Sequence, residues 1–414
     1  MAQSDRRICI VLVALSCGCS TQPRALPQAL DAGSFTGAGV DPFDVPLAGL
    51  SADDVRIFDQ GDRLFDLPLR DYDGLGPLYT RTSCSACHAE ATRGPGLVQK
   101  MAVVEADGVT PAADQSKLRY GHTVHPLMTA GAKTPIVPPD DDSNVKVTLR
   151  VGPPVLGRGY LEAVLDSEIE RVAGEQAERD DAIHGRVNHV IYASEANSDQ
   201  RFHQHQPGDT VIGRFGLKAR IATLDDFVAD ALQGDMGITS PLRPAEFPNP
   251  DGLTDDLKPG IDTTEDNLNL RAMYVRMLAI PRRAQLDARG QALFAEIQCD
   301  ACHTPALKTQ PDYPIARLAG IDAPIFSDLL LHDMGDALAD GISDGEAGGR
   351  DWRTTPLIGV RFDQTLMHDG RAQSVEEAVL AHDDPKSEAR DAVQRYRDLE
   401  PADQQALLDY VSAL

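Results

Sequence analysis

Apolar residues recur at helical spacing in three parts of the chain, within residues 51–65, 286–294 and 401–414. The positions are Val55, Ile57, Phe58, Leu64 and Phe65 in the first part, Leu286, Ala292, Leu293 and Phe294 in the second, and Leu407, Val411 and Leu414 in the third. Side chains three or four residues apart share one face of a helix. The pattern therefore predicts three helices, and Pro401 suits the first turn of the last one.

The long middle of the chain has a different character. Residues 105–280 are rich in Pro, Gly and acidic residues, notably from Pro241 to Asp266. Such a composition predicts loops between short helices, and the stretch is too long to be a bare linker. We therefore expect a mainly α-helical fold in two modules. Residues 51–280 form the first, enlarged by loop-rich insertions, and residues 281–414 form a compact second one.

The N-terminus has the features of an export signal. Two arginines precede the apolar residues 8–15, which are too few to span a bilayer. A cysteine follows this run, so residues 1–16 are interpreted as a lipoprotein-type export signal, with Cys17 or Cys19 as the acylated residue. An ordinary signal peptide that contains cysteines is the alternative. Residues 17–50 are then a flexible tether, and we expect a periplasmic protein that meets the membrane only through a lipid anchor.

The overall charge restricts the class of partner. Hydrophobic residues make up 42% of the chain and charged residues 25%, which is typical of a globular protein. The formal net charge of −25 repels a phosphate backbone, so nucleic acid is not expected to bind. A basic or neutral partner is favoured.

Four of the seven cysteines form two CxxC pairs, each followed directly by histidine. The motifs are Cys84-Ser-Ala-Cys87-His88 and Cys299-Asp-Ala-Cys302-His303, and the other cysteines, Cys9, Cys17 and Cys19, lie in or beside the export segment. In a CxxCH motif the two thiols bond to the vinyl groups of a heme, and the histidine is the proximal ligand of its iron. The sequence therefore predicts two covalently attached c-type hemes and leaves no cysteine for a structural disulfide.

Two other readings of the cysteine pairs fit less well. A zinc site would not require a histidine after both pairs. A thioredoxin-like motif would follow a strand and open a helix in a βαβ unit, which is not the pattern here.

A short echo precedes the two motifs. Leu78-Tyr79 ends five residues before Cys84, and Leu293-Phe294 ends five residues before Cys299. The echo favours a duplicated heme module. The alternative is chance, because pairs of Leu and an aromatic residue are common.

Several further segments follow one another in a specific order. They are Arg150-Val-Gly-Pro-Pro-Val-Leu-Gly-Arg-Gly-Tyr-Leu-Glu162-Ala, Gly213-Arg-Phe-Gly-Leu-Lys218-Ala, Asp235-Met-Gly-Ile-Thr-Ser240, Ser327-Asp-Leu-Leu-Leu-His332-Asp-Met334-Gly, Asp351-Trp352-Arg-Thr-Thr-Pro-Leu and His368-Asp-Gly-Arg371. With the first heme motif, they make nearly the whole mature chain resemble the diheme oxidoreductases often labelled thiol oxidoreductases. These are distant relatives of bacterial diheme cytochrome c peroxidases.

The resemblance implies a peroxidase-like oxidoreductase. In this reading the second heme is low-spin and relays electrons from a small redox protein or another donor to a reactive first heme, where hydrogen peroxide binds. Cleavage of the peroxide bond needs a group that moves a proton, and Glu162 in the central segment is our candidate; a structural carboxylate is the alternative.

Two other functions remain open from the sequence. One is pure electron transfer with both irons six-coordinate. The other is oxidation of a partner protein or thiol, as in the similar diheme enzyme that matures methylamine dehydrogenase. Calcium between the modules is a further candidate cofactor.

The sixth iron ligands separate electron relay from catalysis. For the second heme, the resemblance implies His382, because the related peroxidases place an iron ligand at that point after a His-Asp-Gly segment. Met334 and Met367 are the alternatives, although Met is more often a packing residue.

For the first heme we favour an open sixth position. His122, His125 and Met101 are candidate ligands, and a surface loop is the alternative for the two histidines. His184, His189, His203 and His205 lie in polar stretches and are expected to be exposed.

The resemblance also bears on electron transfer between the hemes. The family commonly carries Trp where this chain has Leu217, and the only tryptophan here is Trp352, in the second module. A route through position 217 is therefore in doubt.

Overall fold

The structure is a computed structural model that describes residues 45–89, 96–139, 142, 144–254, 257–280 and 287–414. The predicted export signal, both candidate acylated cysteines and most of the tether lie outside these residues, as does Leu286. Within the predicted tether, Val45 and Leu47 are each only 1% exposed and belong to the main hydrophobic core.

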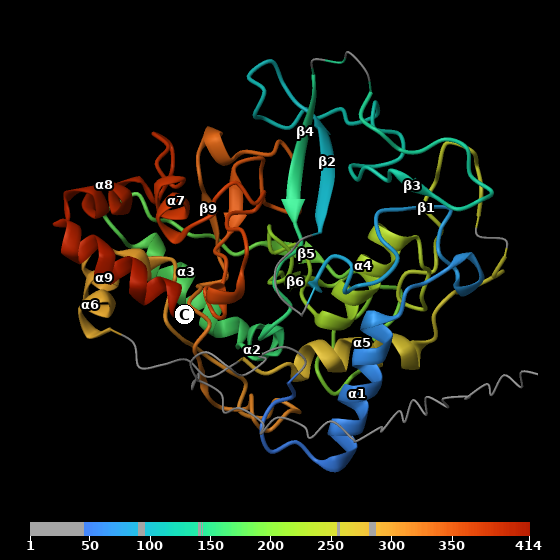
Figure 1. Cartoon of the computed structure of the whole chain (residues 1–414), viewed down its shortest axis with the longest axis horizontal. Coiled ribbons are helices and arrows are strands. Elements are labelled where there is room, and N and C mark those ends of the chain that lie inside the picture. Colours follow the sequence, from blue (N-terminus) through green and yellow to red (C-terminus); the bar gives the residue numbers. More distant parts are fainter. Residues whose placement is uncertain (1–44, 90–95, 140–141, 143, 255–256, 281–286) are drawn as a thin grey trace, which may run out of the picture.

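Two packed helices form the base of the N-terminal half (Figure 1). Helix α1 (Ala52–Asp66) starts at Ser51, whose hydroxyl accepts a hydrogen bond from the Asp54 N–H, and its partner is α5 (Glu265–Met277). The helices approach so closely that a Cβ on Gly61 would lie 2.2 Å from the Leu270 carbonyl oxygen. Helix α1 confirms the first predicted helix, and its apolar face is the one that packs.

The remaining helices follow the chain toward its C-terminus. The N-terminal half adds α2 (Arg158–Ala163), α3 (Asp166–Ala177) and α4 (Leu224–Met236), and the C-terminal part has α6 (Ala288–Glu296), α7 (Val375–Leu380), α8 (Arg390–Asp398) and α9 (Pro401–Ser412). Helices α6 and α9 pack together through Gly290, where a Cβ would lie 2.3 Å from the Ala406 carbonyl oxygen. They confirm the other two predicted helices, and Pro401 lies in the first turn of α9 as expected.

The strands in the described residues form small antiparallel pairs. The pairs are β1 (Leu78–Tyr79) with β3 (Leu127–Met128), β2 (Leu97–Val103) with β4 (Val145–Val151), β5 (His189–Ile191) with β6 (Thr210–Ile212), β7 (Leu307–Lys308) with β8 (Asp322–Ala323), and β9 (Leu331–Asp333) with β10 (Asp351–Arg353). The longest, β2–β4, stands at the top of the molecule in Figure 1. Helices are thus the main regular structure of the described residues, as expected, but they make up only 30% of the chain.

The main hydrophobic core crosses the predicted boundary between the modules. It contains Phe58 and Tyr274 from the N-terminal side and Tyr313 and Leu330 from the C-terminal side. A second core cluster lies wholly in the C-terminal part and joins α6 to α9. The boundary itself falls beside residues 281–286, outside the described part, so the division into two heme modules stays a prediction.

The two CxxCH motifs have different local surroundings. Leu78-Tyr79 forms strand β1, whereas Leu293-Phe294 lies inside helix α6. The same residue pattern thus forms a strand in one place and a helix in the other, and the duplicated heme module stays a prediction. In the described residues, no helix has the length and apolar character that a membrane crossing requires.

Candidate functional site: two cavities at the CxxCH motifs

Each CxxCH motif forms part of the wall of its own cavity. The first cavity is lined by Cys84, Cys87 and His88 with residues of α1, α2, α4, α5 and β10. The second is lined by Cys299, Cys302 and His303 with residues of α6, α7, α8 and α9. Their empty volumes, counting the part open to solvent, are about 850 and 1450 Å³, so the second cavity is the larger of the two.

In the first cavity His88 is held against a glycine. A Cβ on Gly152 would lie 3.0 Å from His88 Cε1, so only glycine fits there without a shift. Burial lowers the pKa of His88 to about 4, and the nearby Pro153 backbone opposes the effect in part. The imidazole is therefore neutral at physiological pH, which is the form that binds a metal.

Charged side chains give the first cavity its electrostatic character. Four arginines line it, namely Arg81, Arg158, Arg271 and Arg353. Asp235, at the end of α4, is the one acidic residue among the described residues of the wall. The wall thus carries an excess of positive charge, which suits anionic groups such as heme propionates.

The candidate sixth ligands of the first iron lie outside the first cavity. His122, His125 and Met101 are not among the residues that line the first cavity. The His122 ring nitrogen Nδ1 lies 2.9 Å from the Met101 carbonyl oxygen, and His125 Nε2 lies 2.8 Å from the Gly234 carbonyl oxygen, where each donates a hydrogen bond. His88 is therefore the only imidazole that the described wall offers.

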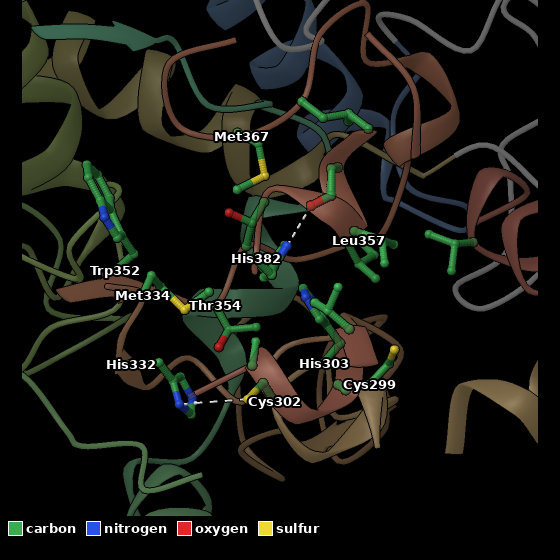
Figure 2. Close-up of a pocket in the computed structure, with 18 of the residues that line it drawn as sticks. Cys299, Cys302, His303, His332, Met334, Trp352, Thr354, Leu357, Met367 and His382 are labelled. Atoms are coloured by element: carbon green, nitrogen blue, oxygen red, sulfur yellow. Dashed lines mark hydrogen bonds between the residues drawn. The ribbon is translucent and has the colours of Figure 1, made fainter. Parts of the chain in front are cut away.

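The second cavity brings two histidines together (Figure 2). His303 follows the motif, and His382 follows α7; both reach into the cavity. His303 Nδ1 donates to the Phe326 carbonyl oxygen at 3.2 Å, and His382 Nδ1 donates to the Ala378 carbonyl oxygen at 2.6 Å. In each neutral ring Nε2 then keeps its lone pair, which is the arrangement of metal-binding histidines.

The two imidazoles also affect each other. Burial lowers the pKa of His303 to about 4, and the nearby His382 lowers it further. Burial likewise lowers the pKa of His382. Both rings are neutral and suited to bind iron.

The sulfur alternatives share the second cavity. Met334 and Met367 both line it, with their side chains drawn near Thr354 and His382 respectively in Figure 2. The predicted preference for His382 over the two methionines stays a prediction, because all three reach the cavity.

His332 lines the same cavity but has both ring nitrogens occupied. Nε2 lies 2.9 Å from Asp328 Oδ2 and Nδ1 lies 2.7 Å from Glu388 Oε2. Burial alone would lower the pKa of His332, but the neighbouring Asp328 carboxylate raises it. His332 is therefore a charged partner of two carboxylates and offers no lone pair to iron.

A thin partition separates the two cavities. Arg353 lines both, Gly216 lines the first and Leu217 lines the second. The Arg353 N–H donates to the Leu217 carbonyl oxygen at 3.0 Å, and Arg353 Nε donates to the Gly216 carbonyl oxygen at 3.0 Å. Position 217 therefore lies between the cavities, and in this chain it is occupied by an aliphatic leucine rather than by an aromatic residue.

Trp352 lies beside this partition and lines the second cavity. Its ring stacks on His368 with centroids 3.8 Å apart, and Lys218 Nζ lies 4.2 Å from its centroid. Two groups this close cannot share one face of the ring, so Trp352 is sandwiched. The Val151 N–H donates to the His368 carbonyl oxygen at 2.8 Å, which connects this stack to the segment beside His88.

Glu162 is placed in a buried polar network, away from both cavity walls. It accepts hydrogen bonds from Arg276 Nε at 2.6 Å, Arg276 Nη2 at 3.0 Å, the Tyr313 hydroxyl at 2.7 Å and the Leu224 N–H at 2.7 Å. Since Leu224 lines the first cavity, the hydrogen bond from its N–H to Glu162 helps to fix the position of that wall residue. This arrangement favours the structural alternative and gives no support to the catalytic role, which stays a prediction.

Two of the four histidines expected to be exposed are not, because His205 is half-buried and the His203 side chain is buried more deeply. The His203 side chain is only 7% exposed, and its Nε2 lies 3.0 Å from Asp225 Oδ2. The sequence around His203 is polar and gives no sign of this burial, because its partner Asp225 lies further along the chain, in the first turn of α4.

The residues of both cavities fit a c-type heme. Each wall presents two thiols and an adjacent imidazole on one side and apolar side chains elsewhere, and the first adds arginines that can pair with propionates. Sequence reasoning missed Asp235 and Arg353 as wall residues, although both belong to quoted segments. Their only signal was their place in these segments.

A family model described as "Di-haem oxidoreductase, putative peroxidase" matches residues 139–414, a range that includes the second CxxCH motif. No curated protein matches the chain. Among solved structures, hydrazine synthase from Kuenenia stuttgartiensis is 14% identical with a TM-score of 0.39, covering 99% of this chain and 100% of that chain. The diheme peroxidase BthA from Burkholderia thailandensis E264 is 15% identical with a TM-score of 0.39, covering 94% of each chain. Because both TM-scores are under 0.5, we base nothing further on these two likenesses.

Proposed function

This chain belongs to the di-haem oxidoreductase family, and we propose that it is an exported c-type cytochrome that reduces peroxide at the first cavity. The observation that carries the proposal is an asymmetry. The second cavity presents two imidazoles with free Nε2 lone pairs, whereas the described wall of the first presents only His88.

The bound hemes supply the iron at which peroxide binds and the capacity to store electrons. The protein holds them through Cys84 and Cys87 in the first cavity and through Cys299 and Cys302 in the second. His88 and His303 are the proximal ligands in this proposal. The arginines of the first cavity hold the propionates and leave the far side of that cavity to the substrate.

In the second cavity, His303 and His382 would both hold the iron of a bound heme, which would then exchange electrons without binding peroxide. Met334 is the alternative ligand. The shared wall residue Arg353 and the stacked pair of Trp352 and His368 keep the two sites close, which supports a relay from the second site to the first.

The electron donor is proposed to be a small redox protein. A net charge of −25 favours a donor with a basic face, because complementary charge speeds encounter. Export to the periplasm, a lipid anchor at Cys17 or Cys19, and calcium between the modules belong to the same proposal.

Electron paramagnetic resonance of the purified ferric protein tests the proposal. We expect one high-spin and one low-spin heme, and we expect added hydrogen peroxide to change the high-spin signal and to be consumed with a small reductant. A protein with two low-spin hemes and no response to peroxide would refute peroxidase chemistry and favour pure electron transfer. Loss of the heme to acidified acetone would contradict covalent attachment.

Oxidation of a partner protein or thiol gives a different result in the same samples. The high-spin signal would be present and would respond to peroxide, but small reductants would not be turned over.

A further inference from the structure

Arg271 is a buried cation on the wall of the first cavity. It lies in α5, is 4% exposed, and lines the cavity together with the first motif. Its Nε donates to the Leu64 carbonyl oxygen at 3.2 Å, and its Nη1 donates to the Asn267 carbonyl oxygen at 3.2 Å. Leu64 lies in the last turn of α1, where helix carbonyls have no partner within their own helix. Two backbone oxygens thus hold the guanidinium in one orientation.

The charge of Arg271 differs from that of Arg276 on the same helix. Arg276 pairs with Glu162 and Asp225. Among the described residues, no carboxylate forms an ion pair with Arg271, and its Nη2 has no hydrogen-bond partner. Burial lowers the pKa of Arg271, and the Cys84 sulfur acts in the other direction, but this sulfur becomes an uncharged thioether once heme is attached. Because a guanidinium keeps its proton, a buried positive charge is left without an anion.

Arg81 is a second arginine of this kind. It lines the same cavity, and its Nη1 donates to the Thr80 carbonyl oxygen at 2.7 Å. In the part of the chain that the structure describes, no carboxylate pairs with it. The charge of Arg81 acts on the Cys87 sulfur, as that of Arg271 acts on the Cys84 sulfur. The two arginines therefore lie on the thiol side of the cavity.

The known anions of the first cavity do not account for these two arginines. In heme, the vinyl groups that bond to the thiols and the propionates lie on opposite edges of the porphyrin. Arginines beside the thiols are thus far from the propionates, which Arg158 and Arg353 can hold. Asp235, the acidic residue of the described wall, interacts mainly with Lys100.

We propose that Arg271 and Arg81 form a binding site for a small planar oxyanion on the thiol side of the first cavity. The inference rests on the heme attachment proposed above, but not on peroxidase chemistry. A guanidinium is planar and binds carboxylates and similar oxyanions through paired N–H groups. Two ligands share this chemistry, namely a free inorganic oxyanion such as nitrite and the carboxylate of an organic substrate.

Calorimetric titration of the intact diheme protein tests the site, with sodium nitrite as one probe and sodium acetate as the other. Arg271→Gln and Arg81→Gln remove one positive charge each, and Arg271→Lys keeps the charge without the planar group. Arg63→Gln is the matched control, because Arg63 is an exposed residue of the last turn of α1 and is not among the residues that line the cavity. Imidazole, a neutral iron ligand, shows by paramagnetic resonance whether each variant still admits a ligand to the iron.

We expect the wild type to bind one oxyanion, more weakly as sodium chloride is added. Arg271→Gln should weaken this binding roughly 10- to 100-fold, the effect of losing a hydrogen bond to a charged group. Arg271→Lys should recover part of the affinity. Arg63→Gln should match the wild type within about twofold, because solvent and salt screen an exposed charge, and imidazole binding should be the same in all variants. Tighter binding of nitrite than of acetate identifies a free oxyanion as the ligand, and the reverse order identifies an organic carboxylate.

The outcomes separate this inference from the proposed function. A heme-loaded wild type that binds neither probe would overturn the oxyanion site and leave the peroxidase proposal intact. Binding that neither Arg271→Gln nor Arg81→Gln weakens would also overturn it, because the anion then lies elsewhere. If Arg271→Gln does not retain its heme, Arg81→Gln decides the question, and an unchanged affinity in that variant counts against the inference. A wild type without covalent heme would remove both the site and the function.

Discussion

Replacement of Glu162 distinguishes a structural carboxylate from a catalytic one. The Arg276 side chain is 0% exposed and that of Glu162 is 6% exposed, so their ion pair is sealed from water. Glu162→Gln keeps the volume but removes the charge and leaves Arg276 with Asp225 as its remaining carboxylate partner. Removing one partner of a buried ion pair costs about 3–5 kcal/mol, and we expect a loss of stability at the lower end of this range because Asp225 remains.

Tyr313→Phe is the matched comparison within the same network. It removes a single hydrogen bond, 2.7 Å long, to the same carboxylate. Hydrogen bonds to a charged group contribute about 1.5–3 kcal/mol, so this variant should lose less stability than Glu162→Gln. Urea unfolding of the holoprotein, followed by far-ultraviolet circular dichroism at pH 7, measures both.

Glu162 has no structural role if Glu162→Gln unfolds at the same urea concentration as the wild type. The structural role is also contradicted if this variant keeps its stability and its spin states but no longer reacts with peroxide, since that pattern belongs to a residue that takes part in the reaction. A destabilised variant that still reacts with peroxide when folded supports the structural role.

Three further predictions concern other parts of the molecule. His382→Gly should convert the low-spin ferric signal to high-spin while Met334→Leu leaves it unchanged, and the opposite pattern in paramagnetic resonance would make Met334 the ligand. Trp352→Phe should lower the free energy of unfolding by about 1–3 kcal/mol, because it removes the indole hydrogen bond to Leu338 and weakens the contact with Lys218; an unchanged urea midpoint would contradict this. Although burial opposes the shift, a hydrogen bond from His203 and the charge of Arg276 lower the pKa of Asp225 below its usual range. The ionised Asp225 therefore stabilises the fold fully above its unfolded pKa of about 3.9, and this contribution is lost as the pH falls further. The free energy of unfolding, measured between pH 5 and pH 3, should fall less steeply in Asp225→Asn than in the wild type.

Glu162 and Asp235 show the limit of reading single residues from the sequence. Both are carboxylates in segments that resemble the family, and no local feature ranks one above the other. In the structure, α2 turns Glu162 toward Arg276 and Tyr313, whereas the last turn of α4 places Asp235 on the cavity wall. The partners that make one structural and leave the other unpaired come from segments far away in the chain.

The sequence by itself determined the features that depend on neighbouring residues. The spacing within CxxCH predicts heme attachment, because two thiols and an imidazole need only five consecutive residues to hold a porphyrin and its iron. The helices at residues 52–66 and 401–412 were also predictable, because their apolar faces and first turns are local patterns. Only the tertiary structure decided which side chains complete each cavity, because His382, Arg353 and Asp235 reach their places through packing between distant segments. Local spacing carries no information about such contacts.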